Sequence, residues 1–201
     1  MASQTGISNQ ALAQVGQEPI TAVDTSTRQG RICLAVWSLV LDAMLEVHAW
    51  GFATKRVALQ QLSETPEFGF AYAYAVPSDC VRILEVSPDT EYSIEAGQIL
   101  SNEDELALKY VHKVTQAGLF PPWFALAMSD AIAARICFAF EGSASKRKML
   151  EEIAAGSLSV AIAKDTRQAW QDPGPTDSED SWLTARGASD STEVLTIESA
   201  D

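Results

Sequence analysis

STRQGRICLAVWSLVLDAMLEVHAWGF, residues 26–52, is the stretch that decides the fold. Apolar side chains recur along one side of it at spacings of three and four, which predicts a helix over about residues 26–50. This core-facing stripe contains Ile32, Val36, Leu39, Val40, Ala43, Met44, Val47 and Trp50. The opposite side is apolar as well, at Leu34, Trp37, Leu41 and Leu45. Because a helix that is apolar all round is buried all round, we expect the second row to face a neighbouring subunit.

The bulk composition indicates a globular protein with an acidic surface. The chain has 201 residues, of which 47% are hydrophobic, and a formal net charge of −13. This length allows one substantial core with a small second lobe. A protein that binds nucleic acid regardless of sequence needs a basic footprint, which this charge opposes. An acidic lining can still face DNA that slides past without adsorbing.

The acidic residues are concentrated at the C-terminal end. Residues 172–201 contain eight acids and one base, whereas the first 171 residues contain 19 acids and 13 bases. The tail is a separate compositional segment with too few apolar residues to form a core. Two interpretations stay open for it. Either the tail has no fixed structure, or it folds on a partner through side chains of the anchor type: Trp182, Leu183 and Arg186.

Cysteine usage and the first residues fit a reducing compartment. The cysteines are odd in number and form neither a metal-ligand spacing nor a clear disulfide frame: Cys33, Cys80 and Cys137. No basic region followed by an apolar run opens the sequence, so no signal peptide is expected. The most apolar stretch, residues 123–140, is interrupted by polar residues, which predicts a buried helix rather than a membrane span.

No set of residues in the sequence predicts catalysis or a cofactor. Neither His48 nor His112 has a Cys, Asp or Glu at metal-ligand spacing. The sequence contains no nucleophile elbow, phosphate-binding glycine loop or dinucleotide fingerprint. Cys80 is interpreted as a small buried side chain rather than a reactive thiol. We therefore predict a protein that is not an enzyme and holds no cofactor and no metal.

The periodicity changes along the chain from helix to strand and back to helix. Ala96-Gly97 predicts a tight hairpin, and Pro121-Pro122 opens a helix. A short first helix is expected from about Ser8, its N-cap, to Val15, with Gly16 as the C-cap glycine. The other helices are expected at about residues 26–50, 121–140 and 145–170, and extended segments at about residues 53–59, 70–76, 81–86, 92–95, 98–100 and 106–114.

This order predicts an α+β fold, because the helices and strands are segregated rather than alternating. We expect an antiparallel helical bundle with a small antiparallel β-rich insert and an extended C-terminal tail. The helical part comprises residues 1–52 and 116–171, the insert residues 53–115, and the acidic flexible tail residues 172–201.

A basic run stands near the start of the last predicted helix, where the helix dipole disfavours cations. One interpretation is a solvated first turn. The other is contact with an acidic partner, either the tail of an adjacent subunit or a phosphate backbone. The run consists of Lys146, Arg147 and Lys148.

Several motifs follow one another in an order that resembles a known family. Asn9-x-Ala-Leu-x-x-Val-Gly16-x-x-Pro19-Ile20 is followed by the long helix and by Trp50-Gly51-Phe52. VPSDCVRI at residues 76–83, a proline-started, alanine-rich helix and DSWLTAR at residues 180–186 complete the series. In this order and spacing the chain resembles the head-to-tail adaptors of short-tailed phages, of the tail tubular protein A type.

The resemblance implies a structural protein of the virion, assembled in the host cytoplasm and located in the neck or tail. Such adaptors form a dodecameric ring beneath the portal protein. Their β-rich insert faces a tail nozzle or tail tube, sometimes with tail fibres, and genomic DNA passes through the ring without sequence-specific binding. No membrane is involved. In such a ring the second apolar row of the long helix, Leu34, Trp37, Leu41 and Leu45, is the expected subunit interface. The anchor residues of the tail, Trp182, Leu183 and Arg186, are the expected portal-docking residues.

Two other functions stay open. The chain could be the head-completion adaptor of a long-tailed phage or of a gene-transfer particle, which shares the ring but has different tail partners. A small enzyme or small-molecule-binding domain would need a cluster of titratable residues in a pocket. The sequence offers no such cluster, so this alternative ranks last.

Overall fold

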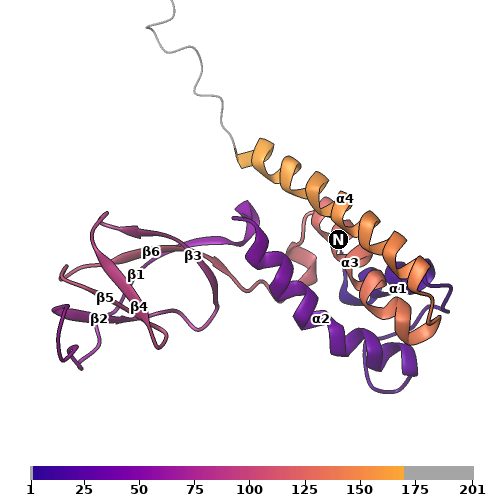
Figure 1. Cartoon of the computed structure of the whole chain (residues 1–201), viewed down its shortest axis with the longest axis horizontal. Helices are drawn as coiled ribbons and strands as arrows, with labels where there is room; N and C mark the ends of the chain where they lie inside the picture. Colours follow the sequence, from indigo (N-terminus) through magenta and orange to yellow (C-terminus); the bar gives the residue numbers. More distant parts are fainter. Residues whose placement is uncertain (1, 170–201) are drawn as a thin grey trace, which may run out of the picture. The chain divides into compact units, whose positions relative to one another are not determined.

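The computed structural model describes residues 2–169, which contain four α-helices and six β-strands in an α+β fold (Figure 1). The helices in this range are α1 (Gln4–Gln14), α2 (Arg28–Val47), α3 (Pro122–Phe140) and α4 (Ala144–Ala169), with short 3-10 turns η1 (Gly51–Ala53) and η2 (Ala117–Leu119). The strands are β1 (Thr54–Ala58), β2 (Tyr72–Ala75), β3 (Cys80–Ser87), β4 (Tyr92–Glu95), β5 (Gln98–Ser101) and β6 (Ala107–His112). The predicted α+β class is confirmed.

The strands form two three-stranded antiparallel sheets, with the orders β1-β6-β3 and β2-β5-β4. The β4–β5 hairpin turns at the predicted dipeptide, where Ala96 has φ of 49° and Gly97 has φ of 77°. Two successive positive φ values are what a tight two-residue hairpin turn requires. The strands of the β-rich segment are therefore antiparallel, as predicted, and they are divided between two small sheets.

Helix α1 begins earlier than predicted. Its N-cap is Ser3, whose side-chain oxygen accepts a 3.0 Å hydrogen bond from the Gly6 N–H. The predicted cap, Ser8, is instead buried inside the helix, so that prediction was wrong. The end of the helix is as predicted, because Gly16 has φ of 71° and stands just past the C-cap.

The connector after α1 is fixed by an asparagine side chain. The Asn9 Nδ2 donates to the Ile20 carbonyl at 2.9 Å, and the Asn9 Oδ1 accepts from the Ile20 N–H at 2.8 Å. This pairing supplies both backbone groups of Ile20 with partners, which lets the segment follow the helix closely. Asn9 and Ile20 are the two ends of the first motif noted in the sequence.

Helix α2 is capped by Thr27 and ends at Val47, three residues before the predicted end. The last residues of the predicted helix turn away from its axis, since His48 has extended backbone angles. Trp50 is fully buried at this turn, and its indole Nε1–H donates to the Met44 carbonyl at 2.7 Å. That bond satisfies a carbonyl at the end of the helix that has no partner within it. Trp50 therefore belongs to the turn rather than to the helix.

Helix α3 is the central helix, against which α1, α2 and α4 all pack (Figure 1). In length and composition it could cross a membrane, with a mean hydropathy of 1.5, yet 61% of that stretch is buried inside the fold. The same properties are typical of the core helix of a globular protein. The position of α3 agrees with the buried helix predicted for residues 121–140.

Two hydrophobic clusters hold the described residues together. The larger lies among the helices and contains an aromatic group in which Trp50 stacks on Trp123 at 5.6 Å and meets Phe124 edge to face at 5.1 Å. Such pairs stabilise beyond the area that they bury. The smaller cluster lies between the two sheets and comprises Tyr74, Val86, Ile99, Leu106, Leu108 and Tyr110.

Candidate functional site

The outward side of α2 carries a continuous apolar row. All four members are exposed, with 58% of Leu39 and 52% of Val47 accessible to solvent. They recur at intervals of four residues, so they lie one above another on the same side of the helix. The α2 row consists of Ala35, Leu39, Ala43 and Val47.

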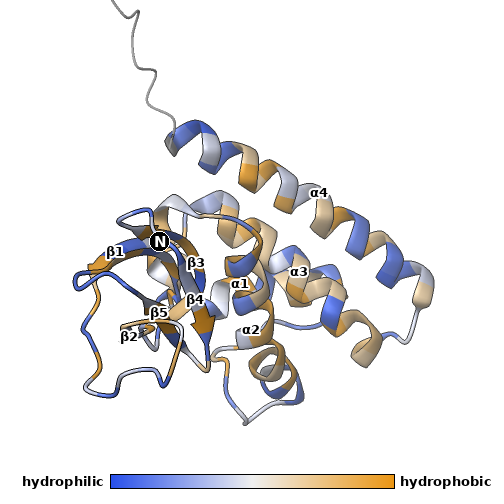
Figure 2. Ribbon diagram, turned by 60° about the vertical axis from the view of Figure 1, so that its left-hand side comes forward, coloured by the Kyte–Doolittle hydropathy of each residue, from blue (hydrophilic) through white to orange (hydrophobic). Residues whose placement is uncertain are grey.

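A second apolar row runs along the outward side of α4. Its members are also exposed, and they recur at intervals of four, three and four residues. In the hydropathy colouring of Figure 2, apolar bands interrupt the polar length of α4. The α4 row consists of Met149, Ile153, Gly156 and Val160. Because α2 and α4 each pack on α3, the molecule presents two separate apolar rows, one on each of two helices.

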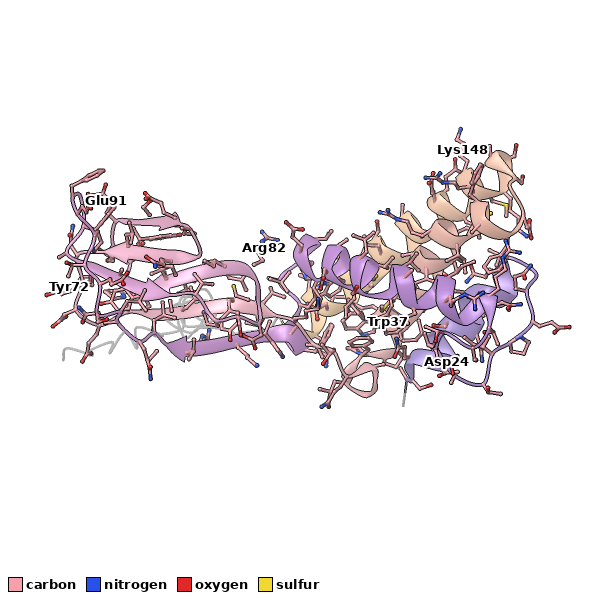
Figure 3. The ribbon with its side chains drawn as sticks, turned by 90° about the horizontal axis from the view of Figure 1, so that it is seen from below. Asp24, Trp37, Tyr72, Arg82, Glu91 and Lys148 are labelled. Carbon is pink, nitrogen blue, oxygen red and sulfur yellow. The ribbon has the colours of Figure 1, made fainter. Side chains whose placement is uncertain are left out.

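The prediction of the subunit interface was wrong for most of its residues, because they are buried within the chain itself. Trp37, Leu41 and Leu45 are buried in the chain's own core, and only Leu34 is exposed. Figure 3 shows Trp37 directed in among the helices. Conversely, Leu39 and Val47 were expected in the core and face outward. The sequence pattern placed the stripe about a quarter-turn away from its true position, because apolar residues on every side of the helix leave its rotation undefined.

The basic run lies in the first turns of α4 and is partly neutralised. Lys146 pairs with Glu141, and the Arg147 Nε donates to Glu151 Oε1 at 2.8 Å, one helical turn further along. Lys148 makes no ion pair with any residue in the described range and projects away from α4 in Figure 3. Exposed pairs of this kind contribute little to stability. The choice between a solvated turn and an acidic partner stays open.

The predicted docking residues of the tail, Trp182, Leu183 and Arg186, lie outside the described residues, as does the whole segment 172–201.

A buried carboxylate that the sequence did not single out fixes the turn after α2. Asp165 of α4 accepts hydrogen bonds from the Gly51 N–H at 3.1 and 3.2 Å, and its Oδ2 lies 3.1 Å from His48 Nε2. The Asp165 side chain is 5% exposed. Buried carboxylates need such partners to offset their desolvation. Asp165 therefore joins the end of α4 to the point where the helical part passes into the strands.

A second buried carboxylate joins three helices. Asp130 of α3 accepts a 2.7 Å hydrogen bond from Gln14 Nε2 of α1 and a hydrogen bond from the Ser157 hydroxyl of α4. The Ser129 hydroxyl lies 3.5 Å away. Asp130 is the single acid of the otherwise apolar α3, which was a sequence signal for it, whereas Asp165 is one of three acids in α4 and had no such signal. Their partners could not be read from the sequence, because those partners lie on other elements.

A third polar cluster lies on the sheet β1-β6-β3, with Lys55 in β1, Tyr110 in β6 and Asp79 directly before β3. Asp79 accepts hydrogen bonds from Lys55 Nζ and from the Tyr110 hydroxyl, both at 2.9 Å. The hydrogen bond from Lys55 lowers the pKa of Asp79 below its ordinary value, and the bond from Tyr110 acts in the same direction. Burial, reinforced by the hydrogen bond to Asp79, raises the pKa of Tyr110 to about 12. These shifts favour the charged carboxylate and the neutral phenol, a stable structural pair.

The adjacent thiol does not have the properties of a nucleophile. Burial raises the pKa of Cys80, and the neighbouring Asp79 charge raises it further. A reactive cysteine needs a lowered pKa, which counts against a reactive thiol at Cys80. The side chain is half-buried rather than fully buried as predicted. Among residues 2–169, no group of three or more His, Cys, Asp and Glu side chains is placed to hold a metal ion.

Comparison with protein-family models and with curated proteins finds no match to this chain. The functional inference therefore depends on the surfaces described above and on the order of motifs in the sequence.

Proposed function

We propose that the protein is a structural virion protein, a head-to-tail adaptor that assembles into a ring between the portal and the tail. The observation that carries this proposal is the pair of outward apolar rows on α2 and α4. A closed ring with head-to-tail contacts needs two different surfaces on each subunit, one for each neighbour. Two separate apolar rows on one subunit supply such surfaces.

In this proposal the α2 row of one copy packs on the α4 row of the next copy. Both rows combine large side chains with Ala or Gly, so one helix can fit its larger side chains against the small residues of the other. Four large members of these rows are about half exposed in a single copy, so burying the rest of each would contribute about 1 kcal/mol: Leu39, Val47, Ile153 and Val160. The helices would act as an antiparallel bundle that forms the ring wall, with about twelve copies, as the resemblance implies.

The remaining partners follow from the same resemblance. The portal would lie on one side of the ring, and a tail nozzle or tail tube on the other. The acidic composition suits a channel through which DNA passes. Negatively charged side chains repel the DNA phosphates, so the DNA does not bind to the channel wall.

Imaging of the assembled protein by negative-stain electron microscopy tests the proposal. Two variants each disable one row: Leu39→Glu with Val47→Glu on α2, and Ile153→Glu with Val160→Glu on α4. The matched control places the same charges at exposed apolar positions of the sheets, with Val57→Glu and Ile94→Glu. We expect rings with the wild type and the control, and no rings with either row variant.

Mixing the two row variants distinguishes a head-to-tail contact from a symmetric one. Each variant retains one intact row, so the mixture should form pairs that cannot extend into rings. Rings from either variant alone, or the same loss of rings in the control, would contradict the proposal. Unchanged far-ultraviolet circular dichroism shows that each variant is folded.

A further inference from the structure

The sheet β2-β5-β4 and its connecting loops carry acidic side chains without any basic ones. Residues 60–78 and 87–106, all of which the structure describes, contain no lysine or arginine. Their eight carboxylates are Glu64, Glu67, Asp89, Glu91, Glu95, Glu103, Asp104 and Glu105. This part of the surface therefore has one sign of charge, whereas the helices carry both signs.

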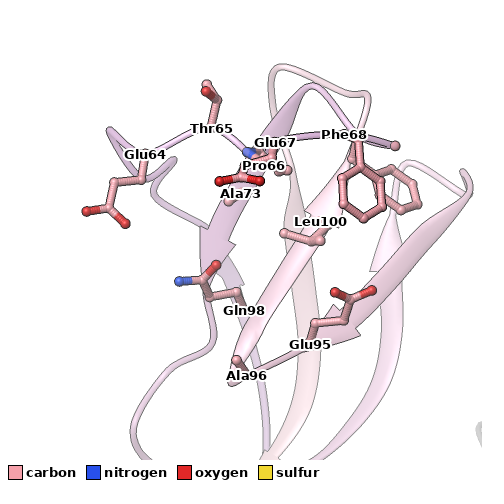
Figure 4. Close-up of a pocket in the computed structure, with 12 residues that line it drawn as sticks. Glu64, Thr65, Pro66, Glu67, Phe68, Ala73, Glu95, Ala96, Gln98 and Leu100 are labelled. Atoms are coloured by element: carbon pink, nitrogen blue, oxygen red, sulfur yellow. The ribbon is translucent and has the colours of Figure 1, made fainter.

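A hollow of about 380 Å³ opens on the outer face of this sheet (Figure 4). Its floor is apolar, with Ala73 of β2 beside Leu100 of β5, which are paired in the sheet. The loop between β1 and β2 forms one wall, and the β4–β5 turn forms the other. In Figure 4, Leu100 lies at the centre of the hollow, between the loop and Glu95.

The loop wall holds a phenylalanine in solvent. Phe68 is 86% exposed, the most exposed large apolar side chain in the described range. The loop is held at both ends, since the Leu62 N–H donates to the Ala73 carbonyl at 2.8 Å and the Ala71 N–H donates to Asn102 Oδ1 at 3.0 Å. Phe68 is therefore presented beside the hollow without being buried in it.

Three carboxylates surround this apolar floor: Glu64, Glu67 and Glu95. Within residues 2–169, Glu64 and Glu67 form no hydrogen bond or ion pair through their side chains, and Glu95 accepts only from the Ser93 hydroxyl, at 2.8 Å. A ligand with a positive charge beside an apolar group would satisfy both parts of the hollow. Phosphate-bearing ligands and nucleic acid are negatively charged, so these carboxylates would repel them.

We propose that this hollow is a docking site for a segment of a partner protein, one that carries an aromatic or long aliphatic side chain flanked by lysine or arginine. The apolar side chain enters the hollow against Leu100 and Phe68. The flanking cations approach Glu64, Glu67 and Glu95, which also accelerate the encounter. The site depends on the surface of a single chain and stands whether or not the protein forms a ring.

Fluorescence anisotropy with labelled synthetic peptides tests this site on the full chain. The probes form a series of short peptides with Phe, Trp, Leu or Ala at the centre and with Lys and Arg, Ser or Glu at the flanks. We expect binding of the cationic peptides with Phe, Trp or Leu, weakening as salt rises. Replacing the central residue by Ala, or the flanks by Glu, should abolish binding.

Variants locate the binding on the protein. Glu64→Gln, Glu67→Gln and Glu95→Gln together should weaken binding by about tenfold, since each exposed charge pair contributes modestly. Phe68→Ala should weaken it by a similar factor. The control, Asp89→Asn, Glu91→Gln and Asp104→Asn, removes the same charge from exposed positions outside the hollow and should bind as the wild type does.

Three outcomes would overturn the site: no binding by any cationic peptide, equal weakening in the control, or no effect of Phe68→Ala. The oligomeric state of each variant is measured in parallel by light scattering. Because the hollow lies outside both helix rows, loss of peptide binding with unchanged assembly identifies failure of this site. Loss of assembly with unchanged peptide binding identifies failure of the ring proposal.

Discussion

The helices and the sheet β2-β5-β4 differ in what they expose. The helices bury a large core and two hydrogen-bonded carboxylates, and they present apolar rows to solvent. The sheet has a core of only a few residues and a surface whose charges are all negative. Exposed apolar rows favour association between copies of a protein. A surface that carries only negative charge repels the same surface of another copy. We therefore propose two kinds of contact, one with copies of the chain through the helices and one with a different partner through the sheet.

The largest expected effect is on the helical core. Trp50→Ala should lower the free energy of unfolding by about 3–5 kcal/mol, because it opens a cavity among Trp123 and Phe124 and leaves the Met44 carbonyl without its partner. Urea denaturation followed by circular dichroism measures this change. Phe68→Ala in the sheet loop serves as the comparison and should change stability by less than about 0.5 kcal/mol. Similar losses for the two variants would remove the distinction between a packed core and a presented side chain.

The buried carboxylates come next. Asp165→Ala should cost about 1–3 kcal/mol, because it leaves the Gly51 N–H without an acceptor. Asp130→Ala should lower the free energy of unfolding by a similar amount, because it leaves the Gln14 amide and the Ser157 hydroxyl without their acceptor. Asp89→Ala, an exposed acid of the sheet region, should cost less than about 0.5 kcal/mol. The same denaturation experiment measures all three, and equal values would show that burial of the carboxylate has no structural consequence.

The Asp79–Tyr110 pair makes stability depend on pH at both extremes. The folded-state pKa of Tyr110 is raised from about 10 to about 12, so folding holds the phenol proton more tightly. The stability from this shift is present below pH 10 and is lost as pH rises towards 12. The pKa of Asp79 is lowered, so its contribution is present above the ordinary pKa of aspartate and is lost as pH falls through the lowered value.

Unfolding measured across pH in the wild type, Tyr110→Phe and Asp79→Asn tests this dependence. Tyr110→Phe should lose less stability between pH 10 and 12 than the wild type does. Asp79→Asn should have a smaller loss at acid pH. Parallel pH curves for all three proteins would mean that the pair is not coupled to folding.

The smallest effect is expected from the basic run of α4. Lys148→Ala should change stability by less than about 0.5 kcal/mol, since the side chain is exposed and makes no ion pair in the described range. Arg147→Ala should cost less than about 1 kcal/mol through loss of the Glu151 pair. If Lys148→Ala instead reduces assembly at low salt while leaving stability unchanged, the acidic-partner interpretation of this run is favoured over a solvated turn.

Local signals in the sequence were sufficient for most of the secondary structure. The Ala96-Gly97 turn, the proline start of α3 and the alternating strands all depend on residues close together in the chain, and the structure places them as predicted. The start of α1 was missed because both Ser3 and Ser8 are residues that cap helices well. The choice between them depends on burial, since Ser8 packs inside the fold.

The surfaces were harder to predict because they depend on contacts between distant segments. The rotation of α2 could not be found from a helix that is apolar on all sides, which is why Trp37 and Leu39 were exchanged between core and surface. The hollow on the sheet requires the loop at residues 64–70 to lie beside Leu100. No periodicity within either segment indicates that neighbourhood.

The central claim, that the helix rows assemble copies of this chain into a ring, is tested most directly by native mass spectrometry of the purified protein over a range of concentrations. We expect a closed species, of about 260 kDa for twelve copies of the 21.7 kDa chain. That species should be absent from the variant with Leu39→Glu and Val47→Glu. A 21.7 kDa monomer at every concentration, or the same assembly in wild type and variant, would contradict it.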